Sequence, residues 1–179
     1  RVQELAEKYE VLPKDIEWHM IGHLQTNKVK YMAAFVSLIH GVESLKLLET
    51  IDKEGKKHDR VIPCLLQFYI ASEETKFGLD MEEAKALLES NDYKQMKNVK
   101  IVGVMGMATN TDDEVQVRRE FHHLKEIFDE LKATYFAENP EFKELSMGMS
   151  GDYRIAVEEG STMVRVGSSI FGARNYANI

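Results

Sequence analysis

The sequence predicts an α/β fold in which a parallel sheet curves into a TIM-type (β/α) barrel, and three observations carry this prediction. Short β-prone segments alternate with amphipathic helical segments along the chain, which is typical of a parallel sheet. The segment 61–70 is an almost continuous apolar run, as expected for a strand covered on both faces. Glycine and polar residues directly follow the strands, and in a barrel this end forms the binding face. We expect about six of the eight strands of such a barrel in this chain.

The first half of the chain is expected to supply three strands. Val2 and Leu5 lie at helical spacing, and Pro13 separates their helix from an alternating strand that ends at Gly22. Ser44 is a typical N-cap in front of the next apolar helix. The elements predicted, in order, are a helix over 2–9, a strand over 16–21, a helix over 24–35, a strand over 36–42, a helix over 44–51 and a strand over 61–70.

The second half repeats the alternation. Asp80 is positioned to cap a helix, and Val117, Phe121 and Leu124 recur at helical spacing in a long amphipathic helix. The last strand is apolar around Arg165, so we expect it to be buried. The elements predicted are a helix over 80–88, a strand over 99–107, a helix over 112–136, a strand over 145–149, a helix over 152–159 and a strand over 162–167.

Composition narrows the classes of function. The 179 residues, 44% of them hydrophobic, suit one domain spanning 1–179. A net charge of −7 argues against a nucleic-acid partner, and no apolar run reaches the roughly 20 residues that span a bilayer. The single cysteine, Cys64, lies in an apolar run and fits a reducing, cytoplasmic compartment. No Cys-x-x-Cys pair is present to support a metal site, and no metal is expected.

The residues that follow the last strand indicate a binding site for an anion. Gly167, Ser168 and Ser169 follow that strand directly, so backbone N–H groups and two hydroxyls could converge on a phosphate. Ser150 ends the preceding strand and could join this site, cap the following helix, or do both at once. The alternative for the whole segment is a buried strand followed by a turn, with Arg165 snorkelling or paired.

Four segments resemble the pyridoxal phosphate homeostasis protein family, the relatives of the N-terminal barrel of alanine racemase. They are RVQEL at 1–5, WHMIGHLQTNK at 18–28, LSMGMSGD at 145–152 and GSTMVRVGSSIFGARNY at 160–176. The resemblance covers essentially the whole chain. It implies an alanine racemase N-terminal-like barrel that holds pyridoxal 5′-phosphate (PLP) at the carboxyl ends of its strands. It also implies a role in storing or supplying that cofactor.

The resemblance also assigns residues to the cofactor, and it assigns no catalytic residue. Arg165 is expected to face the pyridine nitrogen, where a permanent cation disfavours protonation of the ring. His19 either faces the barrel interior near the ring or is a satisfied core histidine. The cofactor-binding residues implied are His19, Asn27, Met149 (through its backbone), Ser150, Arg165, Gly167, Ser168 and Ser169.

One departure from the family concerns the lysine that forms the Schiff base with the cofactor. In the family this lysine ends the first barrel strand, and that strand is not in this sequence. Lys28 belongs to a different element, the Gln-Thr-Asn-Lys segment, and is not expected to replace it. We expect one or two strand–helix units upstream of Arg1; the alternative is a chain that binds the cofactor only through its phosphate and ring contacts.

Two functions from different classes follow from the resemblance. The first is a cofactor carrier without substantial catalysis, a monomer whose partners are PLP and PLP-dependent apo-enzymes. The second is a PLP-dependent amino-acid racemase, which would need an acid–base group from a further domain. The chain ends at 176–179 directly after the barrel motif, and this favours the carrier. A barrel for phosphosugars would fit the phosphate site, but not Arg165 or the Met-Gly-Met-Ser segment.

Overall fold

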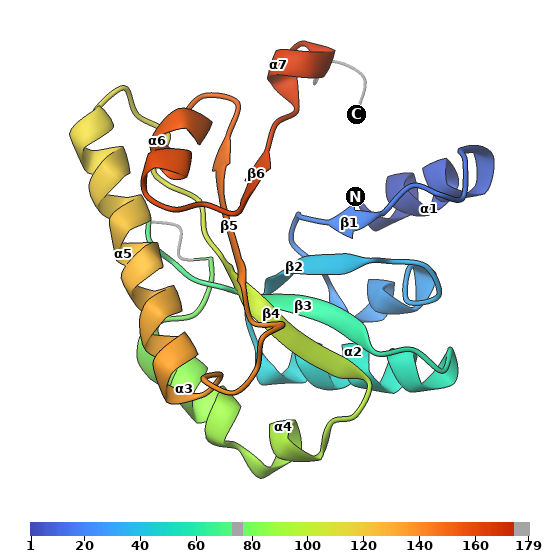
Figure 1. Ribbon diagram of the computed structural model, residues 1–179. Helices are drawn as coiled ribbons and strands as arrows, with labels where there is room; N and C mark the ends of the chain where they lie inside the picture. Colours follow the sequence, from blue (N-terminus) through green and yellow to red (C-terminus); the bar gives the residue numbers. More distant parts are fainter. Residues whose placement is uncertain (73–76, 174–179) are drawn as a thin grey trace.

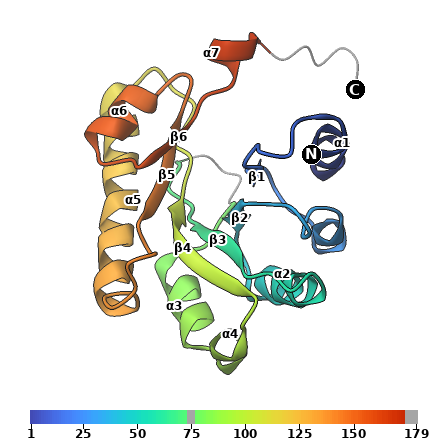
Figure 2. The same cartoon turned by 45° about the vertical axis from the view of Figure 1, so that its right-hand side comes forward.

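A computed structural model describes residues 1–72 and 77–173, so the last residues of the 160–176 segment lie outside the described part. Within the described ranges six strands form one parallel sheet in chain order, which confirms the predicted fold class. They are β1 (His19–Met20), β2 (Leu38–Val42), β3 (Ile62–Gln67), β4 (Val99–Met105), β5 (Glu144–Met149) and β6 (Met163–Arg165). The sheet curves like part of a barrel wall, with helices on its convex side (Figures 1 and 2).

Helices connect the strands and cover the outside of the curve. Side-chain caps fix where four of the described helices begin: Ser44 Oγ accepts from Leu47 N at 3.2 Å, Asp80 forms a capping box with Glu83, Ser90 Oγ accepts from Tyr93 N, and Asp113 caps the longest helix. The helices are α1 (Val2–Val11), the 3₁₀ helix η1 (Thr26–Tyr31), α2 (Leu45–Lys57), α3 (Met81–Glu89), α4 (Asn91–Gln95), α5 (Glu114–Thr134), α6 (Tyr153–Glu158) and α7 (Ser168–Phe171).

Two hydrophobic clusters lie on the two faces of the sheet. The larger one fills the space between the strands and the outer helices, and it includes the predicted stripe of α5. Cys64 is fully buried there, and burial raises the pKa of its thiol. The smaller cluster consists of Leu38, Leu65, Val102 and Met105, with Met163 packed against it. Since alternate residues of a strand share a face, Leu38 and Met163 place His40 and Arg165 on the face of this smaller cluster.

Four predicted elements differ from the structure, and the first is the helix predicted over 44–51, which continues to Lys57 as α2. The strand expected over 16–21 pairs only at His19 and Met20, while Ile16 and Ile21 remain 40% and 39% exposed. The segment 24–35 contains the short 3₁₀ helix η1 where a longer α-helix was expected. The prediction of a buried last strand is wrong, because β6 is an edge strand that pairs only with β5 in the described sheet and Val164 is 36% exposed. Helix α4 was not predicted.

None of the helices in residues 1–72 and 77–173 is long and apolar enough to cross a bilayer.

Candidate functional site

Ser150 brings the ends of β5 and β6 together. Its hydroxyl oxygen accepts hydrogen bonds from the backbone N–H groups of Gly167, at 3.2 Å, and Ser169, at 3.3 Å. The two residues predicted to share the carboxyl end of the sheet therefore do so. A Cβ atom added at Gly167 or Gly151 would meet nothing within 4 Å, so space is open beside both glycines. A phosphate could approach the backbone closely here.

The neighbours of Ser150 settle its local role. Helix α6 begins after Asp152, so the predicted N-cap role of Ser150 is wrong. Asp152 Oδ1 instead accepts from the N–H of Met149 at 2.7 Å. Met147 is fully buried, as expected for packing, but the Met149 side chain is 41% exposed. Helix α7 is a single turn, so anion binding at this point would depend on individual N–H and hydroxyl donors rather than on a helix dipole.

Arg165 reaches from β6 into the concave side of the sheet. Its Nη1 donates to Ser146 Oγ at 2.7 Å, and its Nη2 donates to the carbonyl oxygen of Gly106 at 3.1 Å. The Nε atom is shielded from solvent and has no hydrogen-bond partner in the described structure. Burial lowers the pKa of Arg165 to about 10, although Asp152 raises it, so the guanidinium is still a cation at neutral pH. Of the two alternatives for Arg165, the structure supports the paired one.

A chain of polar side chains continues from Arg165 across the sheet. His40 Nδ1 lies 2.9 Å from Ser146 Oγ, and His40 Nε2 lies 3.0 Å from His19 Nδ1. Ser146 is completely buried and His40 is 1% exposed, whereas His19 is half-buried. Burial lowers the pKa of His40 to about 3, with His19 and Arg165 adding to the effect, and it lowers the pKa of His19 as well. Both histidines are therefore neutral at pH 7.

The chain of His19, His40, Ser146 and Arg165 joins β1, β2, β5 and β6, and we call it the polar chain. His19 also borders a cavity of about 300 Å³ whose wall includes Leu38, Glu144 and Met163, the first residues of three strands. The polar chain thus runs from the amino ends of the strands to Arg165, two residues before Gly167. The sequence prediction missed His40 and Ser146. The available signal was a polar residue inside each of two otherwise apolar strands.

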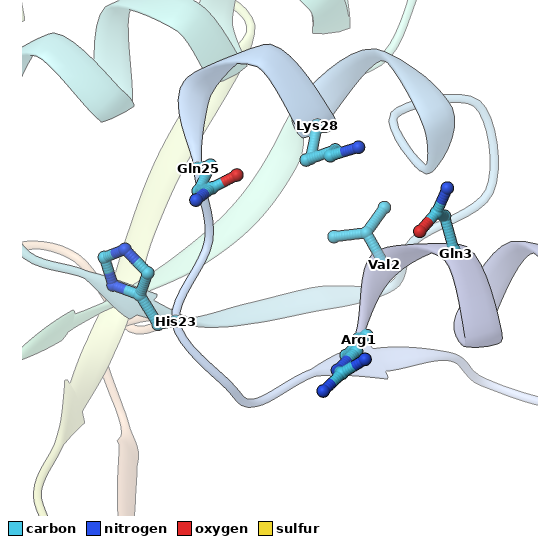
Figure 3. A pocket seen from close by; sticks show the side chains of 6 residues that line it. All are labelled: Arg1, Val2, Gln3, His23, Gln25 and Lys28. Atoms are coloured by element: carbon cyan, nitrogen blue, oxygen red, sulfur yellow. The ribbon is translucent and has the colours of Figure 1, made fainter. Parts of the chain in front are cut away.

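Asn27 lies apart from this arrangement. It is exposed on η1, and none of the described contacts joins it to Arg165 or Ser150. Its neighbours Gln25 and Lys28 instead line a separate pocket of about 240 Å³, together with His23 and the start of α1 (Figure 3). His23 is held there by Glu43, whose Oε1 lies 3.1 Å from His23 Nδ1.

The described residues do not form a cluster that could act as a metal site. Among the described residues, no group of three or more His, Cys, Asp or Glu side chains could hold a metal ion.

Comparison with known sequences places the chain among a well-populated set of relatives. The profile of the family described as alanine racemase, N-terminal domain, matches residues 2–175. A pyridoxal phosphate homeostasis protein of Aquifex aeolicus is 42% identical over 177 residues, which cover 98% of this chain and 75% of the relative. A protein of the same name from Vibrio alginolyticus is 35% identical over 99% of this chain and 72% of its own length.

Comparison with solved structures agrees with the sequence relatives. PipY of Synechococcus elongatus, solved without PLP, matches with a TM-score of 0.83 and 33% identity over 96% of this chain and 79% of its own. PipY with PLP bound matches with a TM-score of 0.80 and 32% identity over the same shares. An alanine racemase of Bartonella henselae, 15% identical with a TM-score of 0.68 over 96% of this chain and 46% of its own, shares the fold.

Proposed function

Because the chain belongs to the alanine racemase N-terminal domain family, and within it to the pyridoxal phosphate homeostasis proteins, we propose that it binds PLP and serves in the storage and supply of this cofactor. The PLP-bound structure of PipY, a relative 32% identical, supports the same ligand for this chain. We further propose that residues 1–179 act as a single, partial PLP-binding barrel domain.

The single observation that carries the proposal is the pairing of a buried cation with an open, N–H-rich strand end. Arg165 and Gly167 lie two residues apart, so one short segment offers a guanidinium and open space beside a glycine. The Nε–H of Arg165 is buried without an acceptor among residues 1–72 and 77–173, and a buried donor of this kind is costly unless a ligand satisfies it. An unprotonated pyridine nitrogen is such an acceptor. The residues present therefore fit PLP.

Each residue of the site has a role in this proposal. Gly167, Ser168 and Ser169 bind the phosphate through N–H and hydroxyl groups, and Ser150 orients two of these N–H groups. The backbone of Met149 lines the same opening. PLP supplies an electron sink for carbanions when it is bound. Arg165, a cation at neutral pH, disfavours a proton on the neighbouring ring nitrogen and so weakens that sink. This is the physical reason to propose a carrier rather than an enzyme.

Titration with PLP tests the proposal. We expect saturable binding followed by absorbance, with pyridoxal, which lacks the phosphate, binding at least tenfold more weakly because it leaves the Gly167 segment without an anion. Arg165→Glu places an anion beside the phosphate and should weaken binding by tenfold to a hundredfold. Equal affinity for PLP and pyridoxal would contradict the phosphate site, and absence of PLP binding would reject the proposed function.

The carrier role has its own test. Exchange of the α-proton of alanine in deuterated water, measured by NMR with PLP-loaded protein, should stay well below one turnover per second. Exchange above that rate would favour the racemase. We also propose that PLP-dependent apo-enzymes are the partners and that the protein is a monomer. Activation of an apo-enzyme by the loaded protein, and its mass in solution, test these two points.

A further inference from the structure

We propose that His40 and Ser146 are positioning residues that hold the Arg165 guanidinium in place for the cofactor ring. This inference rests on the proposed function, because PLP is the ligand toward which Arg165 is held. The observations behind it concern the protein alone and are independent of any ligand.

Ser146 is the only side chain that receives a hydrogen bond from Arg165 among the contacts described, since the other acceptor is the backbone carbonyl of Gly106. The arginine side chain is long and flexible, and its rotamers cost entropy to fix. At a distance of 2.7 Å the Ser146 hydroxyl fixes one Nη atom, and Gly106 fixes the other. The Nε–H is left over as the donor available to a ligand.

Ser146 in turn needs a partner, because a hydroxyl that is fully buried has one hydrogen and two lone pairs to orient. One lone pair accepts from Arg165. His40 Nδ1, at 2.9 Å, either accepts the hydrogen of the Ser146 hydroxyl or donates to its second lone pair. His40 is itself oriented by His19, whose Nδ1 lies 3.0 Å from His40 Nε2. The orientation of Arg165 on β6 therefore depends on a residue of β2. This strand lies near the opposite edge of the sheet, and both residues are on the same face.

The charges around His40 favour this role only while its ring is neutral. The groups that act on it are His19 from β1 and Arg165 from β6, and both oppose a proton on His40. Protonated His40 would place a second cation next to Ser146, which already accepts from the Arg165 cation. A neutral ring keeps one nitrogen as a donor and the other as an acceptor, so it satisfies Ser146 and His19 at once.

Two substitutions of His40 separate positioning from simple packing. The amide of asparagine lies as far from Cβ as Nδ1 of histidine, so His40→Asn retains a partner for Ser146. The amide of glutamine reaches the level of Nε2, so His40→Gln retains a partner for His19. It removes the partner that position 40 provides to Ser146, which then keeps, among the described contacts, only its hydrogen bond from Arg165. Both variants remove the imidazole and both bury an amide. Ser146→Ala removes the oxygen itself, and His123→Gln, on the exposed face of α5, is the control.

The first readout needs no cofactor. NMR of the Arg165 side chain measures rotation of the guanidinium, which is slow while its two Nη atoms hold different acceptors. We expect rotation at least tenfold faster in Ser146→Ala and His40→Gln than in the wild type, a smaller change in His40→Asn and none in His123→Gln. If rotation in Ser146→Ala and His40→Gln equals that of the wild type, the inference is wrong, whether or not the protein binds PLP.

The second readout is the affinity for PLP. We expect a loss of about tenfold in Ser146→Ala and His40→Gln, and a smaller loss in His40→Asn. A purely structural role would instead make the loss follow the stability of each variant, which urea unfolding measures separately. Wild-type protein that binds PLP, combined with equal losses in the Asn and Gln variants, would overturn the inference and leave the proposed function intact.

Discussion

The neutral histidine inside the sheet makes stability depend on pH in a defined direction. His40 in the folded protein takes up a proton only near pH 3, whereas its ordinary pKa is 6.5. Between these values the unfolded chain binds more protons than the folded protein at this position. Stability therefore rises with pH across this window, and the contribution of His40 is lost progressively as the pH falls below 6.5.

The size of the effect follows from the shift. One pKa unit corresponds to about 1.4 kcal/mol, so lowering the pH from 7.5 to 5.0 should cost about 2 kcal/mol through His40 alone. This estimate applies to a side chain that is 1% exposed, so screening by solvent reduces it little. His19 is shifted in the same direction and adds to the loss.

Urea unfolding followed by circular dichroism at pH 7.5 and 5.0 measures this contribution. We expect the wild type to lose about 2 kcal/mol more between the two pH values than His40→Asn, which has no imidazole to protonate. His123→Asn, on the exposed face of α5, should behave like the wild type. An equal pH dependence in the wild type and His40→Asn would refute the reasoning, because His40 would then be charged or solvated in the folded state.

Three further predictions concern other contacts. Glu120 accepts hydrogen bonds from Ser72 Oγ, the N–H and hydroxyl of Thr109 and Gln116 Nε2; burial raises the pKa of its carboxyl, but these bonds outweigh burial and lower it. Glu120→Ala should therefore cost about 3 kcal/mol in urea unfolding, against less than about 0.5 kcal/mol for the exposed Glu126→Ala. Gly103→Ala should prevent folding or cost more than about 3 kcal/mol by thermal unfolding, because its Cβ would lie 1.8 Å from the carbonyl oxygen of Glu144, while Gly151→Ala has open space and should change stability by less than about 1 kcal/mol. Ser150→Ala should weaken PLP binding about tenfold in an absorbance titration, with little change in stability, because the segment 167–169 loses the two hydrogen bonds with which Ser150 holds it in place for the phosphate.

Much of the fold was predictable because its signals are local. The apolar run of β3, the caps Ser44 and Asp80, and the helical spacing in α5 each lie within a few residues of one another. The short β1 and the exposed β6 were not predictable in the same way. Their length and burial depend on neighbouring strands, which periodicity does not describe.

The candidate site could likewise be predicted only in part from the sequence. Gly167 and Ser150 could be placed together because the carboxyl ends of parallel strands share one edge of a sheet. The partners of Arg165 could not be predicted, since Ser146 and His40 are 19 and 125 residues away along the chain and contribute only single polar letters in apolar strands. Resemblance to a family predicted the ligand, but the polar chain could be found only in the structure.

The strict chain order of the sheet has a consequence for how the molecule forms. Each described strand pairs only with the strands that precede and follow it in sequence, so no strand waits for a distant partner before it joins the sheet. Closing each pairing requires only the connection between two consecutive strands, which keeps the entropy of closure small. The sheet can therefore grow from one edge as the ribosome releases the chain, and the contact between His40 and Ser146 closes only when β5 has been added.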